Sequence, residues 1–312
     1  MQIQENISLK QKTTFKIGGQ ARYYVVVEKM TELKKALVFS NKNKPAHFIL
    51  GGGSNLLVAD QGFEGLVVKI RNQDFKITNQ EVVVGAGCIL EKCITETTKL
   101  GLAGLEMLTL IPGTVGGAIV GNAGSFGKSM SNFVVELEVY DVKNNKIEKF
   151  TNQDCQFSYR DSFFKNNSDY IIWSAKLKLE KDEPTAILNR KKQNILNKKN
   201  TLEWRPSAGC VFKNLIFESL DNETIKKLEE IGLDLEKAKE YNKVAVGQLI
   251  DFLGLKGFKI GGALISENHA NFIVNTGKAT ASDVIMLESL IKQKIRDNFG
   301  IQLESEQVYL GF

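Results

Sequence analysis

A glycine-dense stretch at residues 111–127 constrains this chain more than any other part of its sequence. It reads Ile-Pro-Gly-Thr-Val-Gly-Gly-Ala and, two apolar residues later, Gly-Asn-Ala-Gly-Ser-Phe-Gly, with six glycines and almost no charge. Glycine lets the main chain approach a ligand, and backbone N–H groups with hydroxyls can hold a pyrophosphate through neutral dipoles. A long surface loop is the alternative, but long ordered loops in compact domains tend to be functional. We therefore favour a ligand-binding loop.

A second glycine loop, Gly-Gly-Gly-Ser-Asn at residues 51–55, lies between apolar runs at 48–50 and 56–58. Three consecutive glycines can point several N–H groups at one anion. The loop is not a P-loop, because no Gly-Lys-Ser/Thr follows, and it is not a Gly-x-Gly-x-x-Gly turn before a helix. A tight hairpin joining the two apolar runs is an equally weighted alternative, because Gly-Gly is common hairpin chemistry.

A single cysteine, Cys210, lies in the run Arg-Pro-Ser-Ala-Gly-Cys-Val-Phe-Lys-Asn at residues 205–214. A turn delivers the thiol and Lys213 follows it, which suits a thiol at the edge of a cleft beside an anion-binding group. The alternative is a small buried cysteine on a turn, which is what an unpaired cysteine usually is. On this stretch alone, that alternative is favoured.

Charged residues near strands give further candidates. Arg160 follows Tyr159 and can grip a carboxylate through two N–H groups. The alternative, favoured on this segment alone, is a surface arginine paired with Asp161. Glu304 and Glu306 are two residues apart on an expected final strand and so point the same way, although solvated edge residues have the same pattern.

Composition excludes several classes of protein. A net charge of +5 spread along the chain suits an anionic small molecule at least as well as nucleic acid. The four cysteines form no Cys-x-x-Cys pair and the chain has two histidines, so we expect no disulfide scaffold and no metal site. The start carries no signal-peptide pattern, and no apolar run approaches the ~20 residues of a membrane helix. A cytoplasmic protein is expected.

Apolar periodicity predicts a mixed α and β chain. Short apolar runs predict strands at 66–70 and 82–84, and alternation predicts strands at 133–141 and 170–179, with Val135 on a buried face. Helical spacing and end signals predict several helices. They are one capped by Thr31, one over 89–100, a basic one over 184–202, a charged helical segment over 222–239 broken at Gly232, a short one at 246–254, and one capped by Ser282 and stopped by Gly300.

Taken together, the motifs resemble those of the UDP-N-acetylenolpyruvoylglucosamine reductase (MurB) family. The resemblance runs from Thr13 to Leu310, and eight motifs occur in the family's order. They are Leu50-Gly-Gly-Gly-Ser-Asn-Leu-Leu, Gly104-Leu-Glu with Ile111-Pro-Gly-Thr-Val-Gly-Gly-Ala, Asn122-Ala-Gly, Tyr159-Arg-Asp-Ser, Ser207-Ala-Gly-Cys-Val-Phe-Lys-Asn, Gly254-Leu-Lys-Gly, His269-Ala with Val274-Asn, and Leu303-Glu-Ser-Glu. The short segment between Arg160 and the strand at 170 resembles the shorter type II subtype.

The resemblance implies an α+β fold. A FAD-binding region of the vanillyl-alcohol-oxidase (PCMH) type, with subdomains at 1–68 and 69–183, would precede a substrate-binding domain at 184–312. The glycine loops are then the FAD contacts. The cofactor-binding residues implied are Gly51, Gly52, Gly53, Ser54, Asn55, Pro112, Gly113, Thr114, Gly116, Gly117, Asn122, Ala123 and Gly124.

The family's activity implies NADPH-dependent, FAD-mediated reduction of UDP-N-acetylglucosamine enolpyruvate to UDP-N-acetylmuramate in peptidoglycan synthesis. Hydride would come from flavin N5 and a proton from Cys210. Arg160 would neutralise the substrate carboxylate, and Glu306, chosen over Glu304, would hold the enol form. The substrate contacts implied are Tyr159, Lys213, Asn214 and His269. A monomer that binds no nucleic acid and no membrane is expected.

Two other functions compete with the reductase. A related FAD oxidase would need an oxygen-reactive flavin and often a covalent histidine or cysteine link, and neither histidine lies in a glycine loop. A colourless nucleotide- or RNA-binding protein is the third reading, suggested by the basic charge. The sequence also departs from the family pattern beyond Asn214, where the usual proline is missing and the charged segment at 222–239 is extra.

Overall fold

The computed structural model describes residues 1–43, 46–201 and 203–312. The chain divides into two compact units, each assembled from separated segments. The first unit comprises Met1–Ser8, Gln20–Gly53 and Phe63–Lys199, and the second comprises Leu9–Gly19, Ser54–Gly62 and Asn200–Phe312. The three-part division expected from the sequence stays a prediction.

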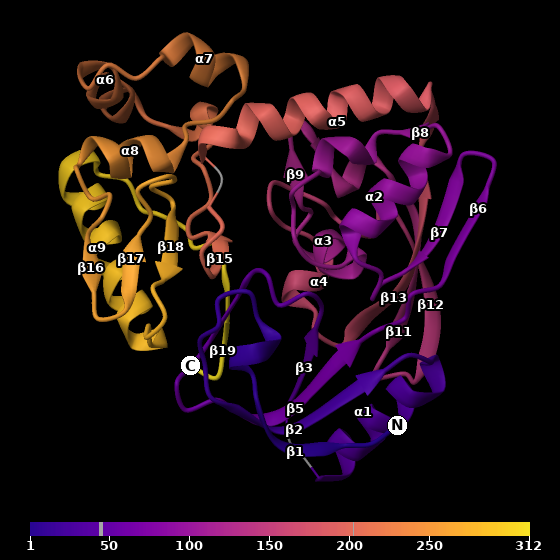
Figure 1. Cartoon of the computed structure of the whole chain (residues 1–312). Coiled ribbons are helices and arrows are strands. Elements are labelled where there is room, and N and C mark those ends of the chain that lie inside the picture. Colours follow the sequence, from indigo (N-terminus) through magenta and orange to yellow (C-terminus); the bar gives the residue numbers. More distant parts are fainter. Residues whose placement is uncertain (44–45, 202) are drawn as a thin grey trace. The chain divides into compact units, whose positions relative to one another are not determined.

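The first sheet of the first unit combines one antiparallel and two parallel pairings. Its order is β1-β2-β5-β3, with β1 (Gln4–Ser8), β2 (Gln20–Val27), β5 (Phe63–Ile70) and β3 (His47–Leu50). β5 runs parallel to both β2 and β3, and α1 (Met30–Asn43) makes the crossover between β2 and β3 (Figure 1). The helix begins at Met30, so the prediction that Thr31 caps it is wrong.

The second sheet of the first unit is entirely antiparallel. Its order is β12-β11-β13-β7-β6, with β12 (Lys146–Thr151), β11 (Val134–Asp141), β13 (Tyr170–Lys178), β7 (Glu81–Gly85) and β6 (Phe75–Thr78). The strands predicted at 66–70, 82–84, 133–141 and 170–179 are confirmed. Val135 is 38% exposed, against the prediction, because the register of β11 on β13 shifts beside it.

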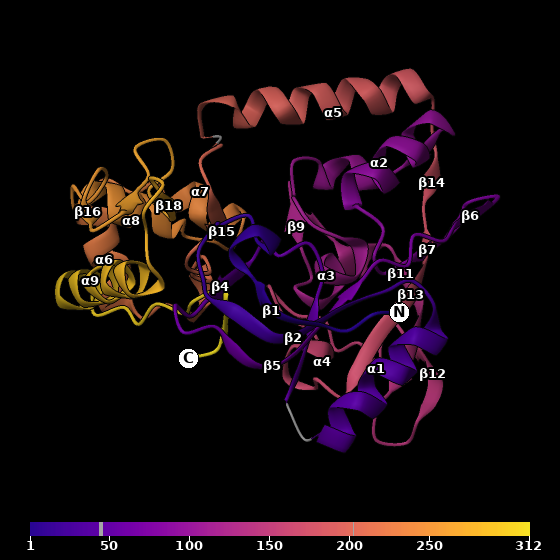
Figure 2. The same cartoon turned by 60° about the horizontal axis from the view of Figure 1, so that its bottom comes forward.

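Helices cover this antiparallel sheet in layers. α3 (Val115–Val120) packs on β7 and β13, α2 (Leu90–Lys99) packs on α3, and α5 (Pro184–Lys198) packs on α2 (Figures 1 and 2). The helix predicted at 89–100 is confirmed as α2. The basic helix predicted at 184–202 is confirmed to Lys198, a 3-10 turn (Lys199–Thr201) follows, and Leu202 lies outside the described residues.

The remaining elements of the first unit are short. They are β8 (Leu102–Ala103), η2 (Leu105–Leu108), β9 (Gly124–Ser125), β10 (Lys128–Ser129), η3 (Met130–Asn132), α4 (Phe163–Asn166) and β14 (Glu180–Lys181). A core of aliphatic side chains from both sheets and from α1 and α2 holds the unit together, including Val25, Leu66, Val84, Ile94 and Leu137.

The second unit is built around a four-stranded antiparallel sheet and one long helix. The sheet order is β15-β18-β17-β16, with β15 (Ser207–Cys210), β18 (Phe272–Asn275), β17 (Ala263–Ile265) and β16 (Lys259–Ile260). α9 (Ala281–Phe299) packs on β16, β17 and α8 (Val246–Phe252) (Figure 1). Its buried stripe of Val284, Leu287, Ile291 and Ile295 confirms the helical periodicity of the sequence.

The ends of α9 agree with the sequence at one side only. Thr280 is the N-cap, with a capping box to Asp283, so the predicted Ser282 cap is wrong by two residues. Gly300 ends the helix at φ +74°, as predicted, in a conformation that favours glycine. The charged segment at 222–239 forms α6 (Asn222–Glu230) and α7 (Leu235–Glu240), and η5 (Phe217–Ser219) precedes them.

Segments from both chain ends complete the second unit. β4 (Leu56–Val58) pairs in parallel with β19 (Val308–Leu310), and η1 (Lys10–Lys12) begins the N-terminal segment. Asn275 donates from Nδ2 to the carbonyl oxygens of Phe15 at 3.1 Å and Lys16 at 3.2 Å. None of the helices in the described ranges combines the length and apolar character needed to cross a membrane.

The buried carboxylate of Glu106 anchors α5 to the rest of the first unit. The Glu106 side chain is 2% exposed and accepts from Nε of Arg190 at 2.9 Å, and Nη1 of Arg190 also lies 2.7 Å from Asp182. A buried charge that loses its partner is costly, whereas an exposed lysine on the same helix contributes little.

We therefore expect Arg190→Met to lower the free energy of unfolding by about 2 kcal/mol. Lys192→Met, at an exposed position of the same helix, should change it by less than about 0.5 kcal/mol. Urea unfolding followed by circular dichroism measures both. Equal losses in the two variants would show that the Glu106 pair does not anchor the helix.

Candidate functional site

The glycines of the loop at 51–55, which belong to the first unit, meet the glycine loop at 111–127 there. A Cβ atom built on Gly52 would lie 2.4 Å from Cα of Gly113, and one on Gly51 would lie 2.8 Å from Oγ1 of Thr114. A side chain at Gly52 would collide with the Gly113 main chain, so the main chains of the two loops pack directly against each other at this point, whereas Gly51 lies against the Thr114 side chain. The hairpin alternative for 48–58 is wrong, because β3 pairs with β5 and β4 pairs with β19.

Backbone contacts fix the second glycine loop where α3 begins. Thr114 is the N-cap residue, and its Oγ1 accepts from the Gly117 N–H at 3.4 Å. The Gly116 N–H donates to the Ala86 carbonyl at 2.9 Å, and a Cβ on Gly116 would lie 2.8 Å from Cβ of Ala86. The absence of a side chain at Gly116 therefore allows the start of α3 to pack closely on Ala86, the residue that follows β7.

Asn122 links this glycine stretch to the segment that carries Arg160. Its side chain is buried, donates from Nδ2 to the Ser158 carbonyl at 2.8 Å, and accepts the Ser131 N–H at Oδ1 at 3.0 Å. The next residues are also held by their main chains, since the Ala123 carbonyl accepts the Met130 N–H and a Cβ on Gly124 would lie 2.7 Å from the Lys128 carbonyl. The Asn122 side chain thus connects the glycine stretch to Ser131 and to Ser158, where the turn that carries Arg160 begins.

The turn that follows Ser158 holds Arg160 in an uncommon conformation. Ser158 and Asp161 form a bridge across the turn, and Arg160 between them has φ +56°. Non-glycine residues rarely adopt this region, and such residues cluster at functional sites. The Arg160 carbonyl accepts from Nζ of Lys165 at 2.8 Å, and its guanidinium lies 5.7 Å from the Tyr159 ring centroid.

A bulge places Cys210 in the second unit. β15 pairs with β18 at Ser207 and at Cys210, and the register shifts between them. Gly209 has φ +78°, a backbone conformation that favours glycine even where, as here, there is space for a side chain. Cys210 is half-buried, whereas the other cysteines are buried, and burial raises the pKa of Cys93 and of Cys155 to about 12.

The structure brings the Cys210 segment and the Glu306 segment together. The Glu306 N–H donates to the Val211 carbonyl at 2.8 Å, and the Lys213 N–H donates to the Glu304 carbonyl at 2.9 Å. Asn55 supports this pairing, because its Nδ2 donates to the Glu306 carbonyl at 3.1 Å. Cys210 and Glu306 therefore lie on neighbouring chain segments of one unit, which their sequence separation did not reveal.

Two of the predicted substrate residues, Lys213 and Asn214, have partners within the second unit. Nζ of Lys213 lies 2.5 Å from Glu304, whose side chain is 70% exposed, whereas Glu306 is half-buried. Oδ1 of Asn214 accepts the Val246 N–H at 3.2 Å, at the start of α8. Asn214 is therefore hydrogen-bonded to the helix that follows the extra charged segment at 222–239.

His269 is a half-buried, neutral imidazole. Burial lowers its pKa, its Nδ1 accepts the Asn271 N–H at 3.3 Å, and its ring centroid lies 4.5 Å from that of Phe272. A neutral ring that accepts at Nδ1 carries its proton on Nε2. His269 can thus donate one hydrogen bond from Nε2.

A buried cluster near His269 was missed by the sequence analysis. The Glu203 side chain is 2% exposed, lies 2.6 Å from Nη2 of Arg205, and accepts from Oγ of Ser266 at 2.5 Å. The same Ser266 oxygen accepts the His269 N–H at 3.1 Å. The Arg205 guanidinium lowers the pKa of Glu203 to about 2. The Glu-x-Arg spacing was the available signal, but a surface pair has the same spacing.

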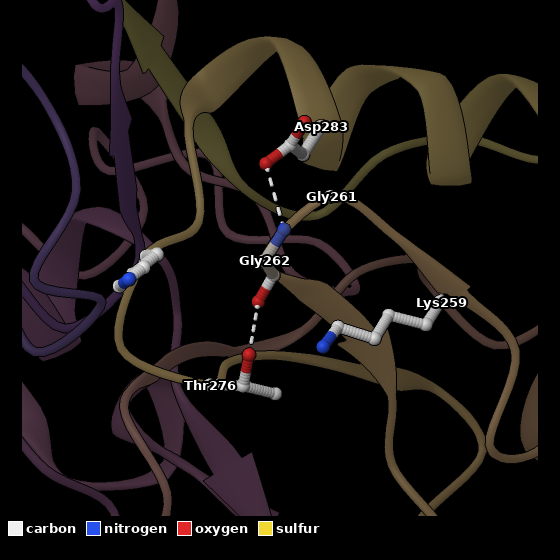
Figure 3. Close-up of a pocket in the computed structure, with 6 residues that line it drawn as sticks. Lys259, Gly261, Gly262, Thr276 and Asp283 are labelled. Carbon is white, nitrogen blue, oxygen red and sulfur yellow. Dashed lines mark hydrogen bonds between the residues drawn. The ribbon is translucent and has the colours of Figure 1, made fainter.

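Figure 3 shows a pocket of the second unit at the start of α9. Its lining residues are Lys259, Gly261, Gly262, Thr276, Lys278 and Asp283. Asp283 accepts the Gly262 N–H at 3.0 Å, and Oγ1 of Thr276 donates to the Gly262 carbonyl at 2.8 Å (Figure 3). In the described part of the chain, none of the predicted site residues lines this pocket.

Known proteins resemble this chain over its whole length. Residues 21–151 match the model of a FAD binding domain, and residues 200–310 match that of the UDP-N-acetylenolpyruvoylglucosamine reductase C-terminal domain. The enzyme of that name from Anoxybacillus flavithermus is 38% identical over 99% of this chain and 94% of its own length. The chain belongs to the UDP-N-acetylenolpyruvoylglucosamine reductase family.

Two further relatives agree with this membership. The Bacillus pumilus reductase is 33% identical over 98% of this chain and 93% of its own length. The crystal structure of the Thermus caldophilus reductase (MurB) superposes with a TM-score of 0.80 at 32% identity, over 99% of both chains. The predicted family and the predicted α+β fold with a FAD-binding region are therefore confirmed.

Family membership makes the protein a flavin-dependent oxidoreductase. It does not decide which residues bind FAD or substrate, so the individual site residues remain predictions. The glycine loops fit a flavin nucleotide physically, because side chains are excluded where the loops touch and the loops carry almost no charge.

The Glu203 cluster predicts an acid-sensitive second unit. The folded-state pKa of Glu203 is lowered from 4.5 to about 2. Its ionised form therefore stabilises the fold above pH 4.5, and that stability is lost as pH falls towards 2. We expect Glu203→Gln to be less stable than the wild type at pH 7 and to lose less stability between pH 4.5 and 2. Thermal melts across this pH range test this, and parallel curves for the two proteins would contradict it.

Proposed function

We propose that the protein catalyses the NADPH-dependent, FAD-mediated reduction of UDP-N-acetylglucosamine enolpyruvate to UDP-N-acetylmuramate, in peptidoglycan synthesis. The observation that supports the proposal is the 2.8 Å hydrogen bond from the Glu306 N–H to the Val211 carbonyl, which joins the main chain of Glu306 to the residue after the half-buried Cys210. Besides a hydride donor, reduction of an enolpyruvyl double bond requires a proton donor and a group that stabilises the enol form. The relatives that match the whole chain carry the name of this reductase.

The two glycine loops are the proposed FAD contacts. The cofactor would be held mainly through main-chain groups, because the two loops pack so closely that a side chain at Gly52 would collide with the Gly113 main chain. The proposed contacts are residues 51–55, 112–114, 116, 117 and 122–124. Bound FAD would supply the redox chemistry, taking hydride from NADPH and delivering it to the enolpyruvyl methylene carbon. The protein must then stabilise the negative charge that develops on the substrate and supply the proton that completes the reduction.

Arg160 would stabilise the negative charge that develops on the substrate. Addition of hydride to a double bond conjugated with a carboxylate builds negative charge on the carboxylate side. A guanidinium binds such a group through two parallel N–H bonds, which strengthen as the charge grows. The bridge across its turn and the bond from Lys165 to its carbonyl hold the Arg160 backbone before substrate binds.

Cys210 would supply the proton, at the carbon next to the carboxylate. An ordinary cysteine thiol, with a pKa of about 8.5, stays mostly protonated at neutral pH yet releases its proton far more readily than a hydroxyl. The main chain of Glu306 is held by the bond from its N–H to the Val211 carbonyl and by the bond from the Asn55 side-chain amide to its carbonyl. Its carboxylate would accept hydrogen bonds from the enol form. Its fixed main chain limits how far the carboxylate can move.

Substrate would be bound by Tyr159, Lys213, Asn214 and His269. A phosphate of the UDP group would replace the exposed Glu304 as the partner of Lys213. His269 would donate from Nε2, since its Nδ1 accepts a backbone bond. We also propose that the protein acts as a monomer, without nucleic acid.

The function is tested by the visible spectrum of the purified protein. A yellow protein should bleach with NADPH under anaerobic conditions and recover its colour when the enolpyruvyl substrate is added. Recovery with oxygen alone, at the same rate as with substrate, would favour a FAD oxidase. A colourless protein whose RNA affinity falls steeply with salt would instead support a nucleic-acid function.

Replacement of the thiol tests its role as proton donor. Cys210→Ala should leave flavin reduction by NADPH nearly unchanged and slow reoxidation by substrate about 10²–10⁴-fold, the usual contribution of a general acid. Cys210→Ser should retain partial activity, because a hydroxyl can take the same role. Stopped-flow absorbance separates the two half-reactions. Wild-type reoxidation in Cys210→Ala would refute the assignment.

The role of Arg160 is tested by a change that keeps the charge. Arg160→Lys should slow substrate-dependent reoxidation at least about tenfold, because lysine lacks the planar two-point grip on a carboxylate. Reduction by NADPH is the internal control. If Lys at this position supported full turnover with an unchanged KM, a point charge would be sufficient and the bidentate role would be wrong.

A further inference from the structure

Asn271 makes an unusual set of contacts at the start of β18. It is 2% exposed. Its Oδ1 accepts the Phe212 N–H at 3.1 Å, and its Nδ2 donates to the carbonyl of the same residue at 2.8 Å. One side-chain amide therefore pairs with both backbone groups of one residue, as a neighbouring strand would.

The Asn271 amide acts where the strand ladder ends. β15 stops at Cys210 after its register shift, yet the next residues are buried and Phe212 is 0% exposed. Backbone N–H and C=O groups in such a position need partners, since each one left without a bond costs about 1–3 kcal/mol. The amide thus continues the ladder by two residues beyond its backbone pairing.

The residue next to Cys210 is held from two sides. The Val211 N–H donates to the Asn271 carbonyl at 2.8 Å, and the Val211 carbonyl accepts from the Glu306 N–H at 2.8 Å. Asn271 therefore contacts both residues that follow Cys210, and Glu306 is attached to the first of them. A shift of this segment would move Cys210 and Glu306 together.

We propose that Asn271 is a positioning residue for the reaction, fixing the 210–213 segment so that the Cys210 thiol and the Glu306 carboxylate hold their places. The inference rests on the proposed function for its catalytic meaning. His269 belongs to the same arrangement, because its Nδ1 accepts the Asn271 N–H at 3.3 Å and its ring position is fixed with it.

A purely structural role is the competing explanation, and β18 supplies a matched control. Asn275, at the other end of the strand, is 4% exposed and also uses its side-chain amide on backbone groups. It donates to the Phe15 and Lys16 carbonyls and accepts the N–H groups of Gly277 and Ala279. Its loss should cost stability without loosening the Cys210 segment.

The first experiment measures the segment directly in Asn271→Ala, Asn271→Asp and Asn275→Ala. Alkylation by iodoacetamide reports on Cys210 in the folded protein, because the other cysteines are buried. Amide hydrogen exchange reports on residues 211–213. We expect both rates to rise about tenfold or more in Asn271→Ala, less in Asn271→Asp, which keeps the acceptor oxygen, and not in Asn275→Ala.

The second experiment separates the half-reactions of the same proteins. Asn271→Ala should slow flavin reoxidation by the enolpyruvyl substrate about 10–100-fold, the scale expected when a reacting group is misplaced by about 1 Å. Reduction by NADPH should stay within about twofold of the wild type. The reoxidation rate of Asn271→Asp should lie between those of Asn271→Ala and the wild type. Asn275→Ala should be reoxidised at the wild-type rate.

The outcomes distinguish the two proposals. Equal changes in alkylation, exchange and reoxidation for Asn271→Ala and Asn275→Ala would overturn the positioning role, because lost stability would then account for them. A loosened segment together with a wild-type protein that does not react with the enolpyruvyl substrate would overturn the proposed function and leave the positioning of Cys210 standing. Should Asn271→Ala fail to fold, unchanged alkylation and reoxidation in Asn271→Asp would overturn the role by themselves.

Discussion

The parallel pairing of β4 with β19 is the contact on which the second unit depends. It joins residues 56–58 to residues 308–310. Asn55, next to β4, accepts the Val308 N–H at 3.0 Å and donates to the Glu306 carbonyl at 3.1 Å. The Glu306 N–H in turn donates to the carbonyl of Val211, the residue after Cys210, so the pairing is connected to the Cys210 segment. The main chain of one candidate catalytic residue, Glu306, is therefore held by a segment 251 residues earlier in the sequence.

The fold could be predicted from the sequence where local periodicity decides the structure. The strands at 133–141 and 170–179 and the buried stripe of α9 follow from the alternation and spacing of apolar residues. Helix starts were less predictable, because a hydroxyl residue can lie in the first turn of a helix, as Thr31 and Ser282 do, as well as at the cap. The pairing of β3 and β4 with distant strands was also out of reach, since the local Gly-Gly signal fits a hairpin.

The candidate site was predictable as a set of motifs, but its contacts were not. Cys210, Arg160 and Glu306 were chosen from the sequence through the family resemblance, and the pairing of Val211 with Glu306 came only from the structure. Buried asparagines were the hardest to interpret. Asn122 bonds the Ser158 carbonyl before Arg160, and Asn271 bonds Phe212 after Cys210. A short neutral amide suits such contacts because it satisfies a donor and an acceptor without burying a charge, but its partner depends on the tertiary fold.

The second unit is assembled from residues 9–19, 54–62 and 200–312. During synthesis, the first two segments leave the ribosome long before the strand with which β4 pairs has been translated. Contacts between such distant parts of a chain pay loop-closure entropy first and fold slowly. The first unit has most of its residues earlier and can form its sheets while translation continues, whereas the second must wait for Leu310. The nascent protein thus passes through a stage in which an oxidoreductase has its glycine loops but lacks the finished surroundings of its thiol.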